Sequence, residues 1–226
     1  MTRTCASPST LAKVIPVSET PCSPSSYVSG LISVLQQLPT ETMSLIIDRL
    51  IAAYDQGRAV YLFGNGGSAA LASHATCDLG KGTAVNGNRR FRVMALTDNI
   101  PLMTAWANDS RYEDIFAEQL RNFIAPGDIS FAISGSGNSP NVLNALALSR
   151  DLGGTNIGLT GFEGGKMKQL CDLCLVVPSD NMQHIEDAHV AISHSVFLAI
   201  RDHITSGQGT AVAAARASRS SGNGNR

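Results

Sequence analysis

Short apolar runs alternate with amphipathic stretches along most of this chain, and this alternation restricts the fold more than any other feature. Five runs rich in branched or aromatic residues have the length of buried strands, and helical spacing fills most of the intervals between them. Strands separated by helices form a parallel sheet that is covered on both faces. The sequence therefore predicts a three-layer, doubly wound α/β fold with a five-stranded parallel sheet. The predicted strands are 59–63, 91–96, 129–133, 156–160 and 173–177, and the predicted helices are 68–79, 112–123, 140–152, 164–171 and 182–204.

The two ends of the chain differ in composition from its centre. Residues 1–26 are rich in Ser, Thr and Pro, so we expect a poorly ordered segment, and residues 206–226 read as a disordered low-complexity tail. Residues 27–205 then form one domain. It begins with two helical stretches between residues 28 and 53, each with an apolar stripe, ahead of the sheet.

The charge balance argues against several classes of partner. The 226 residues include 17 Lys and Arg against 18 Asp and Glu, a net charge of −1, which favours neither nucleic acid nor a membrane surface. Every apolar run is shorter than the roughly 18 residues of a transmembrane helix. The N-terminal segment also lacks the apolar centre of a signal peptide. We therefore expect a cytoplasmic protein.

The chain has five cysteines, an odd number that argues against a disulfide framework in the absence of a secretion signal. Cys171 and Cys174 form a single CxxC pair with no second pair to complete a zinc site. We interpret them as small buried residues at the entrance of a strand. Cys77 is expected in the core, because one helical step turns it about 100° away from Asp78.

A glycine-rich loop follows the first strand and leads into a helix, with the sequence GNGGS over residues 64–68. Glycine lets the backbone approach a ligand closely, and a helix N-terminus offers free N–H groups to an anion. The loop lacks the Gly-Lys-Ser/Thr ending of a nucleotide-binding P-loop. Taken alone, this motif fits an anion site and a tight structural turn about equally well.

A second loop of this kind, SGSGNS, follows the third strand at residues 134–139, and Pro140 then begins a helix. Three hydroxyls and two glycines at a helix N-terminus can hold a phosphate without a lysine. Neither loop carries a metal-binding carboxylate, so a sugar phosphate fits better than a nucleoside triphosphate. The two loops on one sheet predict a phosphate site.

Four residues on two predicted helices supply the chemistry of a second site. His74 and Asp78 are four residues apart on one helix, and Glu186 and His194 lie about two turns apart on the last helix. Two imidazoles and two carboxylates suit a divalent metal such as zinc. They suit proton transfer near neutral pH equally well, and both interpretations stay open at this point.

These motifs together resemble the SIS (sugar isomerase) domain family, and within it most closely the phosphoheptose isomerases. The resemblance rests on GNGGS-x₅-H-x₃-D, SGSGNSPNVLNAL, GLTGFEGGKMKQLCDLCLVVPS and IEDAHVAISH, in the family's order and spacing. It covers most of residues 28–204. It implies an isomerase, an intramolecular oxidoreductase that makes D-glycero-D-manno-heptose 7-phosphate from D-sedoheptulose 7-phosphate through an enediol, as a step of heptose biosynthesis.

The resemblance also implies a role for each matching position. Asp78 and His194 fall where the family has its acid/base pair, and a bound Zn²⁺ and a homotetramer with N-terminal helices packed between subunits are expected. The implied metal ligands are His74, Asp78, Glu186 and His194. The implied substrate contacts are Asn65, Gly66, Gly67, Asp78, Asn108, Asp109, Ser134, Gly135, Ser136, Ser139 and Glu186.

Three positions depart from the family's usual pattern. Asp78 stands where Glu is usual and has a shorter side chain, and Glu186 stands where Gln is usual and adds a negative charge. Lys81 is the nearest cation where an Arg is often found, and lysine lacks the two-pronged fork of arginine. These changes leave two alternatives open: an isomerase of another sugar phosphate, and a non-catalytic sugar-phosphate-binding or adaptor protein.

Overall fold

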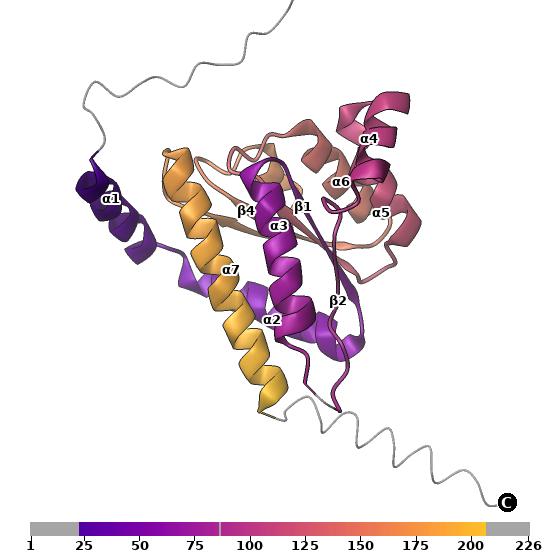
Figure 1. The fold of residues 1–226 in the computed structure, drawn as a ribbon, viewed down its shortest axis with the longest axis horizontal. Coiled ribbons are helices and arrows are strands. Elements are labelled where there is room, and N and C mark those ends of the chain that lie inside the picture. Colours follow the sequence, from indigo (N-terminus) through magenta and orange to yellow (C-terminus); the bar gives the residue numbers. More distant parts are fainter. Residues whose placement is uncertain (1–22, 86, 207–226) are drawn as a thin grey trace, which may run out of the picture.

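A computed structural model of the chain describes residues 23–85 and 87–206, and it confirms the predicted three-layer fold (Figure 1). Of the terminal segments predicted at 1–26 and 206–226, residues 1–22 and 207–226 lie outside the described part. The strands are β1 (Ala59–Gly64), β2 (Arg92–Ala95), β3 (Ile129–Ile133), β4 (Thr155–Thr160) and β5 (Leu173–Val176). The α-helices are α1 (Pro24–Gln36), α2 (Thr40–Gln56), α3 (Gly67–Cys77), α4 (Ile100–Asp109), α5 (Ala117–Phe123), α6 (Pro140–Asp151) and α7 (Met182–Thr205).

The order of the strands determines where a ligand can bind. All five strands are parallel and lie in the order β2-β1-β3-β4-β5, so the direction of winding reverses between β1 and β3. In open α/β sheets, ligands bind outside the carboxyl ends of the strands at such a switch point. Gly64 at the end of β1 pairs with Ile133 at the end of β3. The glycine-rich loop and the hydroxyl-rich loop therefore start side by side at the switch point.

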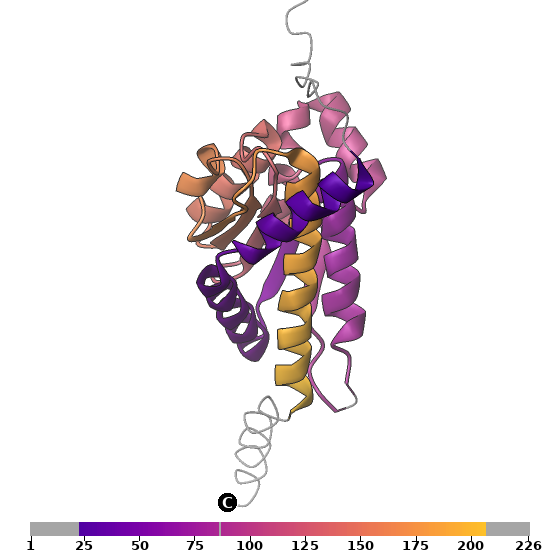
Figure 2. The same cartoon turned by 90° about the vertical axis from the view of Figure 1, so that its left-hand side faces the viewer.

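Side chains of β1 alternate between two separate apolar clusters, as expected for a sheet that is covered on both faces. Val60 and Leu62 pack in a cluster with side chains of α2, α3 and α7. Tyr61 and Phe63 pack on the opposite face with side chains of α5 and α6. In Figure 2, α7 runs alongside α3 on one face of the sheet, and α1 crosses the upper part of α7.

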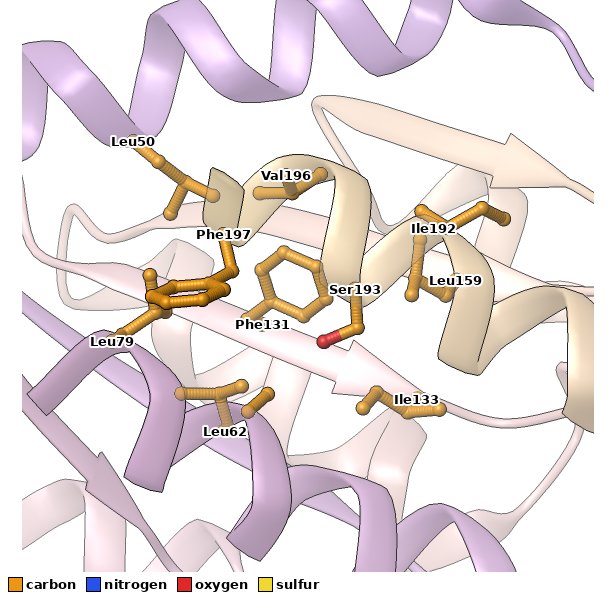
Figure 3. Close-up of a pocket in the computed structure, with 11 residues that line it drawn as sticks. Leu50, Leu62, Leu79, Phe131, Ile133, Leu159, Ile192, Ser193, Val196 and Phe197 are labelled. Carbon is orange, nitrogen blue, oxygen red and sulfur yellow. The ribbon is translucent and has the colours of Figure 1, made fainter. Parts of the chain in front are cut away.

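Apolar side chains of α3, α7 and the sheet line a common pocket between these elements (Figure 3). Leu62, Phe131 and Leu159 of the strands face Ile192 and Val196 of α7 across it. Burial of side chains of this size contributes about 1.5–3 kcal/mol each. This packing fixes the position of α7 relative to α3, and so of the polar residues on both helices.

The turn after α3 departs from the predicted helix. Residues Asp78–Gly82 form a π-helical turn, a feature that often accompanies functional sites. A Cβ atom on Gly82 would lie 2.6 Å from the ring of Phe197, so the absent side chain lets this turn approach α7 closely. The expectation that Cys77 is a core residue is wrong, because Leu71, Ala72 and Ala75 form the buried face of α3 and Cys77 is exposed.

Three further predicted elements differ from the structure. Helix α4 was not predicted, although Asn99 caps it with a bond from the Leu102 backbone N–H. The predicted helix at 112–123 is divided into a 3₁₀ turn (Tyr112–Asp114) and the short α5. The predicted helix at 164–171 is only a 3₁₀ turn (Lys166–Gln169), because Gly164 and Gly165 both have positive φ.

Two observations concern the remaining predictions about the ends and the cysteines. Helix α1 begins at Pro24, after a Ser23 cap, and so starts slightly before the predicted domain boundary. Cys171 and Cys174 are partly buried at the start of β5, and both are free thiols. Among the described residues, none of the helices has the length and the apolar composition needed to cross a membrane.

Candidate active site

The glycine-rich loop between β1 and α3 presents backbone rather than side chains. Gly66 is the N-cap of α3 with a φ of 55°, a left-handed conformation that favours glycine, and a Cβ atom here would meet no atom within 4 Å. Gly66 and Gly67 are exposed, and no side chain caps the helix. The first turn of α3 is therefore accessible to a ligand.

The hydroxyl-rich loop between β3 and α6 packs against the backbone of residues 164–167. Gly137 has a φ of 62°, and a Cβ atom on it would lie 2.2 Å from the carbonyl oxygen of Gly164. The backbone N–H of Met167 donates to the Gly137 carbonyl at 2.9 Å. Ser139 is the N-cap of α6 without using its side chain for capping, and its hydroxyl lies 3.4 Å from that of Ser134. The serine hydroxyls thus gather at a helix N-terminus.

Both loops open into one surface pocket at the carboxyl edge of the sheet. Helix α7 closes its far side with Met182 and Glu186. Six of the residues predicted as substrate contacts line this pocket: Asn65, Ser134, Gly135, Ser136, Ser139 and Glu186.

Glu186 lies over the start of α3. Its Oε1 atom is 3.1 Å from the position that a Cβ atom on Gly67 would occupy. A carboxylate near a helix N-terminus is stabilised by the helix dipole. Glu186 thus lies at the end of α7 that borders the serine loop.

A second cluster lies farther along the same two helices. His74 and His194 have their Nε2 atoms 2.9 Å apart, and Oδ2 of Asp78 lies 3.3 Å from the first and 3.9 Å from the second. The two imidazole side chains are 51% and 48% exposed. All three residues face solvent from the edge between α3 and α7, so a substrate has access to them.

The three ligand atoms fit a divalent metal ion. Zinc in catalytic sites takes two or three histidine nitrogens and a carboxylate at about 2.0–2.2 Å, which places tetrahedral ligand atoms roughly 3.4 Å apart. The observed separations of 2.9, 3.3 and 3.9 Å lie around this value. Three of the four predicted ligands thus form one group. Glu186 is not in it, because eight residues of helix, about 12 Å, separate it from His194.

Two predicted substrate contacts lie apart from the pocket. Asn108 and Asp109 end α4, are exposed and are bonded to each other at 2.8 Å, and neither lines the pocket with the serine loop. Two residues that the sequence did not single out contact Asn65, which lines the pocket. Tyr112 and Asn141 both bond to the side chain of Asn65. Asn141 stands in the SPNVLNAL stretch, but only the register of the two loops reveals its partner.

His189 lies between these regions but belongs to neither. It is 1% exposed, and its Nε2 atom lies 3.2 Å from the Thr160 carbonyl oxygen. Burial lowers the pKa of His189 to about 4, and the hydrogen bond to the Thr160 backbone opposes this shift only in part. His189 is therefore neutral at neutral pH and serves the packing of α7 against β4.

Comparison with known proteins gives one consistent result. Residues 26–161 match the SIS domain family. The phosphoheptose isomerase of Aliarcobacter butzleri is 40% identical over 75% of this chain and 87% of its own length, and that of Mycobacterium tuberculosis is 40% identical over 69% and 79%.

Solved structures of the same class share the fold. Structures of phosphoheptose isomerases from Neisseria gonorrhoeae and Francisella tularensis match with a TM-score of 0.72 each, at 26% and 30% identity. They cover 80% and 79% of this chain, and 96% and 94% of their own chains are matched. The chain therefore belongs to the SIS domain family and, within it, to the phosphoheptose isomerases.

Proposed function

We propose that this protein converts D-sedoheptulose 7-phosphate to D-glycero-D-manno-heptose 7-phosphate. The observation that carries the proposal is the arrangement of two clusters along α3 and α7. A hydroxyl-rich pocket lies at one end, and His74, Asp78 and His194 converge farther along the same helices. The separation of Glu186 and His194, about 12 Å of helix, suits an open-chain sugar with a phosphate at one end and a carbonyl at the other.

The serine loop is the proposed phosphate site. Ser134, Ser136 and Ser139 offer hydroxyls at the N-terminus of α6, where backbone N–H groups and the helix dipole favour an anion. Gly66, at which a Cβ atom would meet no atom within 4 Å, leaves room for the sugar chain at the start of α3. Asn65 is proposed to contact the same substrate from the wall of the pocket.

Asp78 and His194 are the proposed catalytic residues. The Asp78 carboxylate removes a proton from C1 of the open-chain ketose, which gives an enediol, and the proton returns at C2. His194 gives a proton to the C2 carbonyl oxygen as the enediol forms, and takes the proton of the C1 hydroxyl as the aldehyde forms. A carboxylate and an imidazole suit these roles because one accepts and the other exchanges protons near neutral pH.

His74, Asp78 and His194 are also the residues that would hold a divalent ion such as Zn²⁺. This is the alternative to proton transfer, because Asp78 Oδ2 and His194 Nε2 cannot bind the ion and accept a proton at the same time. When bound, the ion would supply electrostatic stabilisation of the negative charge that develops on the two substrate oxygens. The donor set of two imidazole nitrogens and one carboxylate oxygen supports this part of the proposal. Glu186 is proposed to border the sugar phosphate rather than to act as a ligand.

We also propose that the protein acts as a homotetramer in the cytoplasm, where sugar phosphates are metabolised. The support for assembly is an apolar surface on the N-terminal helices: Val28 and Ile32 of α1 and Leu45 of α2 are 53%, 51% and 54% exposed. A second copy of the chain would cover these residues. Sedimentation at micromolar concentration, with Ile32→Asp as a disruptive variant, tests this point.

Product formation by purified protein tests the reaction directly. NMR of sedoheptulose 7-phosphate in D₂O should show the heptose phosphate with deuterium at C2, since the transferred proton exchanges with solvent at the carboxylate. Asp78→Asn keeps the shape but removes the base, and it should slow turnover by about 10²–10⁴-fold. Asp202→Asn, on the exposed end of α7, is the matched control. Binding of the sugar phosphate without turnover by the wild type would instead support a binding protein.

A further inference from the structure

The side chain of Asn65 is held by two residues from other parts of the chain. Asn65 and Asn141 form a reciprocal amide pair: Nδ2 of Asn65 donates to Oδ1 of Asn141 at 2.9 Å, and Nδ2 of Asn141 donates to Oδ1 of Asn65 at 2.8 Å. The Tyr112 hydroxyl lies 3.0 Å from the same Asn65 Oδ1. Asn141 is 1% exposed, whereas Tyr112 is 55% exposed at the outer side.

A backbone group determines which way both amides point. The N–H of Val142, which can only donate, lies 3.0 Å from Oδ1 of Asn141. The amide nitrogen of Asn141 must therefore face Asn65, and the atom of Asn65 that receives it must be oxygen. The Tyr112 hydroxyl consequently donates to Asn65 and does not accept from it.

This arrangement leaves the Asn65 side chain with one free hydrogen-bonding group, an N–H donor, for a ligand. Its oxygen has two lone pairs, and these are occupied by Asn141 and Tyr112. Its nitrogen has two N–H bonds, of which Asn141 takes one. The second N–H remains for the pocket that Asn65 lines together with the serine loop. Asn65 can donate to a ligand in this orientation but cannot accept from it.

We propose that Asn141 and Tyr112 are positioning residues that fix Asn65 as a donor to an oxygen acceptor of the substrate. The inference rests on the proposed function in one respect, that a sugar phosphate occupies this pocket. It adds a requirement on the substrate: the atom beside Asn65 is an oxygen with a free lone pair, on the phosphate, a hydroxyl or the carbonyl. A group that can only donate, such as an ammonium, is rejected there.

A double-mutant cycle between Asn65 and Tyr112 separates positioning from direct contact. The Kd of sedoheptulose 7-phosphate is measured by calorimetry, and KM and kcat by turnover, for wild type, Tyr112→Phe, Asn65→Ala and the double variant. Tyr112→Phe removes the hydrogen bond from the Tyr112 hydroxyl to Asn65, and the exposed position of Tyr112 tolerates the change. It should weaken binding of the sugar phosphate about 3- to 10-fold. In the Asn65→Ala background the same change should alter Kd by less than about 2-fold. Equal effects in both backgrounds would overturn the inference, because Tyr112 would then act on the ligand itself.

Two controls complete the test. Tyr61→Phe removes a comparable hydroxyl that donates to the Phe123 carbonyl, away from the pocket, and it should leave Kd unchanged. Asn65→Asp replaces the donating nitrogen with oxygen and should weaken binding at least as much as Asn65→Ala. Tight binding by Asn65→Asp would overturn the donor assignment. Because Kd does not depend on turnover, a wild type that binds without isomerising would count against the proposed reaction while the cycle still tests the inference. Absence of wild-type binding would overturn both.

Discussion

The Nε2 atoms of His74 and His194 lie 2.9 Å apart, although 120 residues separate the two histidines along the chain. Asp78 completes the group from the first residue of the π-helical turn. Two helices that pack against the same face of the sheet thus create a site that neither helix contains alone. The cluster lies farther along α3 and α7 than the serine loop, which gives the proposed active site two distinct ends.

The cluster should bind zinc in solution. Calorimetric titration of chelator-treated protein with Zn²⁺ is expected to show one tight site per chain. His74→Ala removes one of three ligands and should weaken the affinity by more than about 10-fold, since each ligand of such a site contributes substantially. His203→Ala, which affects a histidine paired with Asp55 at the far end of α7, should bind zinc as the wild type does. Equal affinities for both variants would contradict the ligand assignment.

The serine hydroxyls should act mainly on substrate binding. Ser136→Ala and Ser139→Ala each remove a hydrogen bond to a charged phosphate, worth about 1.5–3 kcal/mol, so KM should rise roughly 10- to 100-fold. The value of kcat should change little, because the reacting carbons lie at the other end of the site. Ser44→Ala, on the exposed face of α2, serves as a control. A selective loss of kcat would mean that this loop holds the carbonyl end.

Neutralising Glu186 should strengthen substrate binding at a small cost in stability. Its carboxylate borders the same pocket as the serine loop and opposes a phosphate there, so Glu186→Gln should lower KM by about 5-fold at low salt. The carboxylate also lies at the start of α3, and its loss from the helix N-terminus should lower the unfolding free energy by about 0.3–1 kcal/mol. Steady-state kinetics and urea unfolding measure the two effects. A higher KM for the variant would indicate that Glu186 binds the sugar through its charge.

His189 should make the stability of the protein depend on pH below neutrality. Burial lowers its pKa in the folded state to about 4, whereas the unfolded chain takes up the proton near pH 6.5. The unfolded state therefore binds more protons between these values, and stability falls as the pH decreases through this window. The contribution of neutral His189 to stability is fully retained well above pH 6.5. The total loss from this group is about 3 kcal/mol.

Urea unfolding between pH 4 and pH 7 measures this dependence. His189→Gln, which cannot titrate, should flatten the decline, whereas His203→Gln should leave it in place. A wild-type slope that survives in His189→Gln would assign the acid sensitivity to other groups.

Much of the fold follows from local patterns, while the site depends on the register between distant segments. The buried strands were predictable because their apolar runs are short and bounded by turn residues, and the parallel topology follows from the alternation. The helix at Ile100–Asp109 was missed, although Asn99 and Pro101 are recognisable start signals and Met103, Trp106 and Ala107 form an apolar face at helical spacing. Gly164 and Gly165 have positive φ, which is incompatible with the α-helix predicted to begin there.

The same contrast applies to the functional residues. His74, Asp78 and the serine loop have local signatures, and the structure places the first two beside His194 and the serine loop at the carboxyl edge of the sheet. The contacts of Tyr112 and Asn141 with Asn65 could not be predicted from spacing, because three separate segments meet there only when β1 and β3 pair. The separation of Glu186 from the His74, Asp78 and His194 cluster, in contrast, follows from the eight helical residues between Glu186 and His194 and was predictable.

The central claim is that His194 acts at the reacting end of a sugar-phosphate isomerase site. The most direct test is the turnover of sedoheptulose 7-phosphate by wild type, His194→Ala and His203→Ala, each with added Zn²⁺. The two substitutions are the same and lie on the same helix, but only His194 is in the cluster. We expect heptose 7-phosphate formation by the wild type and by His203→Ala, with a loss of about 10²–10⁴-fold in kcat for His194→Ala. A loss of less than a few-fold in His194→Ala would contradict it.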